Sequence, residues 1–272
     1  MRGEFVDVGG ARLYCYAAGT RGAGEPVIFI HGFPTSGHLW RDVLPAMPEG
    51  HRAVVLDLLG YGRSDAPGGR ALGVNAHADR VLGLLDTLGV GQACVVGHGL
   101  GGGVAQSLAL RARDRVSRLC LIDSVAFDGW PSAVVRSWRR LSLLVGVLPP
   151  TWIQSIMCKA LERGYASERG ARSLEQYARV FGAGGGRSAM VQHLRALECS
   201  ETVTLGARLH EISVPTAIVW GGQDPFLSPA LGERLRDAIP GATLEVVPSA
   251  GHFTPEDTPA AVASAVARLL GR

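Results

Sequence analysis

The sequence predicts an α/β fold built on a mostly parallel sheet of eight strands flanked by helices. Short apolar runs alternate with segments of helical spacing, which is typical of parallel strands joined by helices. The runs are apolar at consecutive positions, so both faces of each strand are expected to be buried. A Gly9-Gly10 pair between the first two runs predicts a hairpin at the start of the sheet.

These patterns place each element along the chain. The predicted strands are 5–8, 11–16, 26–30, 53–56, 93–96, 119–122, 216–220 and 244–247. The predicted helices outside the central segment are 76–88, 100–112, 230–238 and 259–270. The segment 127–208 has no strand pattern and is rich in Trp and Leu. We expect 127–208 to be a helical lid inserted into a core of residues 1–126 and 209–272.

The composition excludes several classes of protein. A chain of 272 residues with 47% hydrophobic and 19% charged residues is neither disordered nor collagen-like. Its net charge of +3 is too small for a nucleic-acid-binding surface. No apolar stretch approaches the roughly 18 residues of a membrane helix, and the N-terminus lacks a signal segment. With five scattered cysteines that indicate reduced thiols, we expect a cytoplasmic protein whose partner is a small molecule.

The sequence Gly97-His98-Gly99-Leu100-Gly101 follows a predicted strand and opens a predicted helix. This is the context of a nucleophile elbow, G-x-S-x-G, in which a sharp turn exposes the central side chain. Here the central residue is Gly99, so the nucleophile position carries no side chain.

Two further residues complete the pattern of a catalytic triad. Asp224 follows the strand at 216–220, and His252 follows the strand at 244–247. The order of nucleophile position, acid and histidine suits an acid that orients the imidazole as a general base. The loop His31-Gly32-Phe33 follows another strand, and its position predicts an oxyanion hole made by the backbone N–H groups of Phe33 and Leu100.

The chain resembles α/β-hydrolases over essentially its full length, and more closely the branch of epoxide hydrolases and haloalkane dehalogenases. The segments that carry this resemblance are 31–35, 57–65, 97–106 and 122–124. The resemblance implies hydrolysis of a small hydrophobic ester, epoxide or halide, by an elbow Asp or Ser and without a cofactor. We expect no metal site, because no histidines cluster at ligand spacing.

The same motifs and the lid supply candidates for substrate contact. Epoxide hydrolases use lid tyrosines as acids, for which Tyr165 and Tyr177 are the candidates. Asp123 is a possible alternative to Asp224 as the acid of the triad. The residues expected to contact substrate are His31, His98, Asp123, Ser124, Trp130, Trp138, Tyr165, Tyr177 and Phe253.

The glycine at position 99 leaves several interpretations open. The chain is a natural enzyme in which His252 and Asp224 act without a covalent intermediate (as a lyase, isomerase, cyclase or water-attack hydrolase), or a hydrolase disabled in the laboratory. A third interpretation is a pseudoenzyme that only binds a ligand. A fourth assigns another nucleophile, Ser124 or Ser36.

A dinucleotide-binding protein is the remaining alternative. Gly97-x-Gly99-x-x-Gly102 has the form of a dinucleotide fingerprint, and Asp123 ends the next strand, where an acid would contact the ribose. Three or four strands precede the motif, whereas dinucleotide domains usually place it after the first. This alternative, an NAD-binding oxidoreductase, also leaves Asp224 and His252 without a role.

Overall fold

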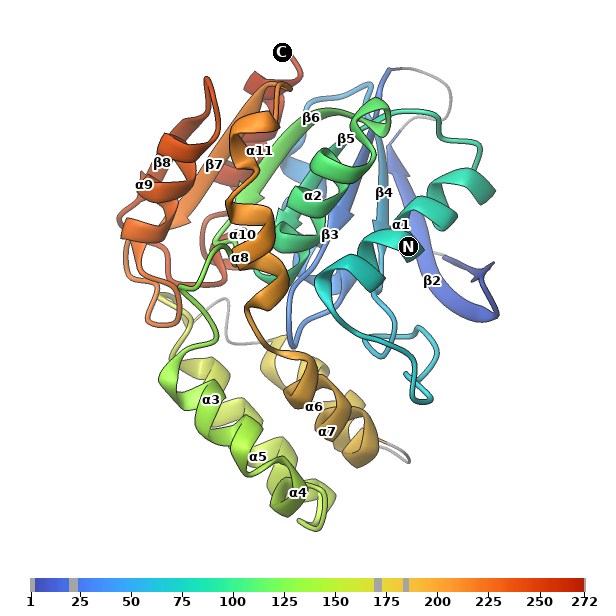
Figure 1. Ribbon diagram of the computed structural model, residues 1–272, viewed down its shortest axis with the longest axis vertical. Coiled ribbons are helices and arrows are strands. Elements are labelled where there is room, and N and C mark those ends of the chain that lie inside the picture. Colours follow the sequence, from blue (N-terminus) through green and yellow to red (C-terminus); the bar gives the residue numbers. More distant parts are fainter. Residues whose placement is uncertain (1–2, 20–23, 169–172, 183–185, 272) are drawn as a thin grey trace.

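An eight-stranded sheet forms the centre of the structure (Figure 1), a computed structural model that describes residues 3–19, 24–168, 173–182 and 186–271. The strand order is β1-β2-β4-β3-β5-β6-β7-β8. Strand β2 runs antiparallel to β1 and β4, and the other neighbours pair in parallel. The strands are β1 (Glu4–Val8), β2 (Ala11–Gly19), β3 (Pro26–Ile30), β4 (Arg52–Leu56), β5 (Ala93–His98), β6 (Val116–Ile122), β7 (Thr216–Gly221) and β8 (Thr243–Val247).

The predicted fold class is confirmed. The expected burial of both strand faces holds in the central strands, whereas the edge strands β1 and β8 keep mostly exposed or half-buried side chains because each has a neighbour on one side only. Gly9 and Gly10 have φ angles of 60° and 75°, the left-handed conformation that a two-residue hairpin turn requires. Every residue of β5 is buried, and successive side chains of a strand point to opposite faces. Both faces of the central sheet are therefore covered, as the continuous apolar runs predict.

Helices flank the sheet, and their positions agree with the helical patterns of the sequence. Helices α1 and α2 pack against each other, α9 packs on β7 and β8, and α11 on β6 and β7. The helices of this group are α1 (Val74–Thr87), α2 (Leu100–Arg111), α8 (Ser200–Gly206), α9 (Pro229–Ala238), α10 (Thr254–Asp257) and α11 (Pro259–Leu269). The short 3₁₀ helices are η1 (Gly37–Trp40), η2 (Leu44–Ala46), η3 (Arg113–Arg115) and η5 (Leu209–Glu211).

Five more helices lie together beyond one end of the sheet, in the lower part of Figure 1. They are α3 (Ala133–Arg140), α4 (Ser142–Val145), α5 (Pro150–Glu162), α6 (Leu174–Gly182) and α7 (Gly186–Ala196). Between β6 and β7 the described residues form no strand, as expected. Helix α8, in contrast, packs against α1 and α2. The division into a core and a lid of residues 127–208 stays a prediction.

A buried carboxylate joins these helices to the sheet domain. Glu256 lies in α10, and its side chain is fully buried. It pairs with Arg41, which follows η1, and accepts hydrogen bonds from Tyr165 Oη at 2.5 Å and Tyr177 Oη at 3.1 Å. Because the tyrosines belong to the helical segment, the cluster ties that segment to α10, four residues after His252.

Among the described helices, none is both long and apolar enough to cross a bilayer. All five cysteines carry free thiols, and Cys15, Cys94 and Cys120 are buried, so they contribute to packing.

We predict that Glu256→Ala lowers the free energy of unfolding by about 3 kcal/mol. The substitution leaves the partly buried Arg41 guanidinium and two tyrosine hydroxyls without their acceptor. The matched control is Glu245→Ala, which removes an exposed ion pair with Arg268 and is expected to cost less than about 1 kcal/mol. Urea unfolding of both variants checks the prediction, and equal losses would contradict it.

Candidate active site

The turn between β5 and α2 has the backbone of a nucleophile elbow. Gly99 has φ 54° and ψ −120°, a conformation in which a side chain is strained. Four hydrogen bonds fix it: its N–H donates to Ile122 O at 3.1 Å, and its carbonyl accepts from the N–H groups of Gly102 at 3.0 Å, Val125 at 3.1 Å and Gly103 at 3.4 Å. The turn is therefore held in place by β6 and by the loop that follows β6.

The glycines of this turn differ in the space around them. A Cβ at Gly97 would lie 2.3 Å from Gly101 O, and a Cβ at Gly101 would lie 2.3 Å from Ile30 O. Both positions require glycine, because the backbone of α2 passes that close to β5 and β3. A Cβ at Gly99 would meet nothing nearer than Gly32 Cα at 3.6 Å and His252 Nε2 at 3.7 Å. Position 99 thus has room for a side chain, and that side chain would be directed at His252.

His252 and Asp224 form a hydrogen-bonded pair beside the elbow. Asp224 Oδ2 lies 2.8 Å from His252 Nδ1, and its other oxygen accepts the N–H groups of Phe226 at 2.8 Å and Leu227 at 2.9 Å. Both residues follow the carboxyl ends of parallel strands, which meet at one edge of the sheet. The carboxylate therefore holds Nδ1 and leaves Nε2 facing the empty place at Gly99.

The surroundings of His252 make it a stronger base than an ordinary histidine. Burial lowers the pKa of His252, but the charge of Asp224, its hydrogen bond and the charge of Asp123 together raise that pKa above 6.5. Burial also raises the pKa of Asp123 well above its usual value, and the charge of Asp224 adds to this. Asp224 is thus the partner of the histidine.

The loop after β3 brings Phe33 to the elbow, where α2 begins with Leu100. Gly32 Cα passes close to the elbow, so close that a Cβ on Gly32 would lie 3.0 Å from Leu100 N. Within the described residues, the N–H groups of Phe33 and Leu100 donate no backbone or side-chain hydrogen bond. Two unpaired N–H groups beside a nucleophile position have the arrangement that an oxyanion hole requires.

An apolar cavity of about 300 Å³ opens at this point, a size within the range of small-ligand sites. Gly99, Leu100 and His252 line it, as do residues of the helical segment. Four of the expected residues lie here with their aromatic side chains on its wall: Phe33, Trp130, Trp138 and Phe253. The cavity suits an apolar small molecule that presents its reacting group to His252.

Four of the residues expected to contact substrate lie outside this cavity, and their polar groups form hydrogen bonds within the protein. His31 Nε2 accepts the N–H of Leu58 at 2.9 Å, so its Nδ1 donates to Gly32 O at 2.9 Å and fixes the loop after β3. His98 Nε2 lies 2.8 Å from the carbonyl oxygen of His252. Asp123 and Ser124 are fully buried.

The two remaining polar groups are also engaged within the core. Asp123 Oδ1 accepts the N–H of Gly221 at 2.7 Å, and Ser124 Oγ accepts from Gln106 at 2.9 Å. A buried Asp123 is out of reach of a ribose, which argues against the dinucleotide alternative. Ser124 is equally out of reach of a substrate in the cavity, so it is not placed to act as a nucleophile.

The expectation that Tyr165 and Tyr177 contact the substrate is wrong for the cavity at Gly99. Neither residue lines it, and both hydroxyls are bound by Glu256. Tyr165 also stacks on Phe253, with ring centroids 4.5 Å apart. Through these hydrogen bonds the tyrosines hold the helical segment to α10, and Tyr165 packs on the residue next to His252. The sequence does not reveal this role, because their acceptor lies 91 and 79 residues away.

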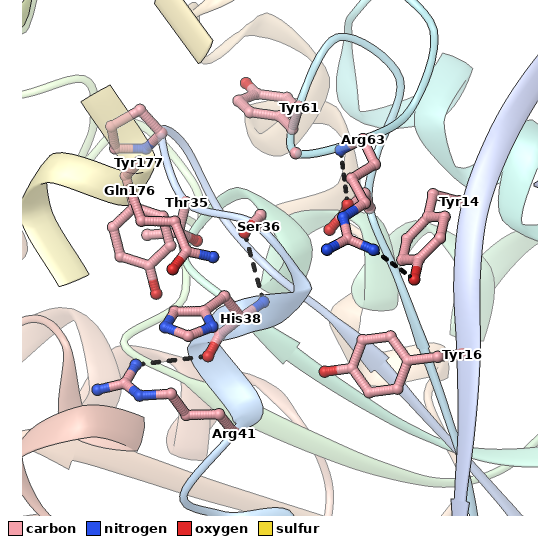
Figure 2. A pocket seen from close by; sticks show the side chains of 13 residues that line it. Tyr14, Tyr16, Thr35, Ser36, His38, Arg41, Tyr61, Arg63, Gln176 and Tyr177 are labelled. Atoms are coloured by element: carbon pink, nitrogen blue, oxygen red, sulfur yellow. Dashed lines mark hydrogen bonds between the residues drawn. The ribbon is translucent and has the colours of Figure 1, made fainter. Parts of the chain in front are cut away.

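A second cavity, of about 330 Å³, lies on the other side of Pro34 and is polar (Figure 2). Figure 2 shows Arg63 and Tyr16 reaching toward it from one side and His38 and Gln176 from the other. Ser36 belongs here, away from Gly99, so it too is not placed to act as the nucleophile. Arg63 is held by Tyr14, whose hydroxyl accepts its Nη1–H at 2.8 Å.

Several residues of the apolar cavity were missed by the sequence reasoning. Phe226 lies edge-on to His252 with ring centroids 5.3 Å apart, and its place two residues after Asp224 was the available signal. Met157 and Leu161 share one face of α5 at a spacing of four, which a helical pattern could have indicated. Leu194 and Leu197 come from α7 and the turn after it, and no local signal marks them.

Comparisons with known proteins agree with this geometry. Residues 25–259 match the family model described as alpha/beta hydrolase fold. The acetyltransferase component of an acetoin cleaving system from Cupriavidus necator is 32% identical over 92% of this chain, which spans only 64% of that protein's length. A soluble epoxide hydrolase from Corynebacterium sp. is 30% identical, over 88% of both chains. An alpha/beta hydrolase fold protein from Burkholderia ambifaria has a TM-score of 0.88 at 26% identity, with 97% of this chain and 99% of that chain covered.

We predict that alanine is far more costly at Gly101 than at Gly99. Gly101→Ala should lower the free energy of unfolding by about 3 kcal/mol, because its Cβ forces the backbone of β3 to move. Gly99→Ala meets no steric conflict and should cost about 1 kcal/mol of backbone strain. Urea denaturation of the two variants measures the difference, and a loss at Gly99 as large as that at Gly101 would refute this account of the turn.

Proposed function

The chain belongs to the α/β-hydrolase family, and we propose that it is an enzyme in which His252, oriented by Asp224, acts as a general base without a covalent intermediate. Its substrate is a small hydrophobic molecule that places a carbonyl oxygen at the N–H groups of Phe33 and Leu100. The observation that carries this proposal is the orientation of the His252 imidazole. Its Nδ1 is bound by Asp224, and its Nε2 faces the open place at Gly99.

The open place at Gly99 suits a reactant in the position of a nucleophile side chain. A water molecule there would donate a hydrogen bond to His252 Nε2 and face the carbonyl carbon. The base takes one proton from water, the hydroxide attacks the carbonyl carbon, and the oxyanion is bound by the two N–H groups. When the tetrahedral intermediate collapses, the imidazolium returns the proton to the leaving group. The same base also suits lyase, isomerase or cyclase chemistry, in which the proton comes from the substrate.

A disabled hydrolase is the second candidate, and the elbow itself favours it. Gly99 keeps the strained dihedral angles of a nucleophile position, and the cavity keeps space for the missing side chain. Hydrolysis of esters, epoxides or halides would then return with the right residue at position 99. A third candidate, a ligand-binding pseudoenzyme, has no use for the Asp224–His252 pair. An NAD-binding oxidoreductase is tested by titration with NADH, which we expect not to bind.

We predict that the chain with Gly99 turns over members of a panel of activated esters, epoxides and β-hydroxy carbonyl compounds, detected by mass spectrometry. His252→Ala should lower the rate by about 10² to 10⁴-fold, the usual contribution of a general base. His98→Ala is not a suitable control, because His98 holds the backbone of His252. The control is His210→Ala, because His210 is an exposed residue of the 3₁₀ helix η5.

Variants at position 99 separate the first two candidates. Turnover only in Gly99→Asp or Gly99→Ser would replace the proposed function by that of a disabled hydrolase, and the restoring residue would identify its chemistry. Binding of panel compounds with no turnover in any form would support the pseudoenzyme.

The rate should depend on pH through His252. Only the neutral imidazole accepts a proton, and its pKa is raised above 6.5. We therefore expect kcat/KM to fall as the pH drops through that raised pKa and to level off above it. In Asp224→Asn the contributions that raise the pKa are reduced and burial remains, so the acid limb should move to lower pH while the plateau falls. A pH–rate profile that does not shift in Asp224→Asn would contradict this role.

A further inference from the structure

A third cavity lies within the lid helices, next to the apolar cavity at Gly99. Its volume is about 180 Å³, and it is bounded by α3, α4, α5, α7 and the turns between them. Every residue on its wall is apolar: Trp138, Leu141, Leu144, Leu148, Ile153, Ile156, Met157, Met190 and Leu194. With no polar group to orient a ligand, this cavity suits plain hydrocarbon.

Three side chains separate the two apolar cavities. Trp138, Met157 and Leu194 line both of them, so the wall between the cavities is one side chain thick. Met157 is almost fully buried and comes from the middle of α5. An unbranched methionine changes rotamer easily, so it is the part of the wall that yields to a ligand.

The sizes indicate how the cavities are used together. A volume of about 180 Å³ is below the roughly 300 to 1,000 Å³ of an independent small-molecule site. The cavity at Gly99, at about 300 Å³, is at the lower limit of that range. The smaller cavity therefore extends the larger one. One end of this extended space carries His252 and the N–H groups of Phe33 and Leu100, and the other end is pure hydrocarbon.

We propose that the lid cavity is a subsite for the aliphatic tail of the substrate, which is an elongated molecule with its carbonyl group at one end of an unbranched alkyl chain. The tail passes Met157 and lies between α4, α5 and α7. This proposal rests on the proposed function for the placement of the carbonyl end, but the tail subsite is tested by binding alone.

The experiment measures the affinity of the chain for a series of straight-chain methyl ketones of increasing length, by titration calorimetry. Each methylene placed in an apolar cavity should tighten binding about fourfold, which corresponds to about 0.8 kcal/mol, until the chain fills both cavities. Beyond that length the affinity should level off.

Two variants fill the tail subsite without changing the cavity at Gly99. Met190→Phe acts from the buried side, and Leu144→Trp acts from the rim, where Leu144 is 61% exposed and a larger side chain is tolerated in folding. In both, short ketones should bind as in the parent chain, and the affinity should level off at a shorter ketone. The matched control is Leu143→Trp, on the same short helix but lining neither cavity, which should follow the parent series.

Levelling at the same chain length in all four proteins would overturn the tail subsite. So would an affinity that stops rising once the cavity at Gly99 is filled. These outcomes are distinct from failure of the proposed function, which would show as turnover unaffected by His252→Ala. One of the two proposals can therefore fail while the other holds.

Discussion

The close passage of the first turn of α2 over the ends of β5 and β3 is the constraint on which the site depends. Gly97 and Gly101 have no room for a Cβ because backbone oxygens lie 2.3 Å from where it would be. This contact sets the direction of the elbow, and with it the place of the Leu100 N–H. Gly32, pressed against the same turn, brings the Phe33 N–H alongside. The places of these two N–H groups are thus a consequence of backbone packing, and His31 holds that packing through its hydrogen bonds with Leu58 and Gly32.

Electrostatics adds a second layer, in which buried carboxylates have different tasks. Asp224 is satisfied by two N–H groups on one oxygen and by His252 on the other, so it stays a fixed acceptor. Asp123 accepts a hydrogen bond from the N–H of Gly221, and burial of its side chain raises its pKa. Glu256 accepts hydrogen bonds from Tyr165 and Tyr177 of the helical segment and pairs with Arg41. Tyr165 stacks on Phe253, so the helical segment is coupled by packing to the residue next to His252.

The sequence could predict what depends on local pattern. Continuous apolar runs located the five central strands, and the Gly9-Gly10 pair located the first hairpin. The residues after the strands located Gly99, Asp224 and His252, because parallel strands bring their ends to one edge. The sequence could not predict contacts between residues that lie far apart in the chain. Tyr165 and Tyr177 resemble catalytic acids in the sequence, but in the structure Glu256 binds both hydroxyls. Leu194 and Met190 carry no local signal either, since what sets their role is the packing of α7 against α4 and α5. Helix α8 shows the same limit, because its place beside α1 and α2 follows from their contacts and not from its own sequence.

Gly99 changes what the rest of the site has to provide. A covalent hydrolase holds part of its substrate by a bond to the enzyme during the reaction. A base that acts directly on a bound molecule has only position to rely on, and position is worth several kcal/mol of the barrier when the reacting atoms are held near attack distance. Under the proposed mechanism, the lid is therefore part of the catalytic apparatus: the Glu256 cluster holds it in place, and the hydrocarbon end of the cavity fixes where the carbonyl can lie. Binding energy from the alkyl tail, far from the reacting atoms, is then what holds the carbonyl at Phe33, Leu100 and His252.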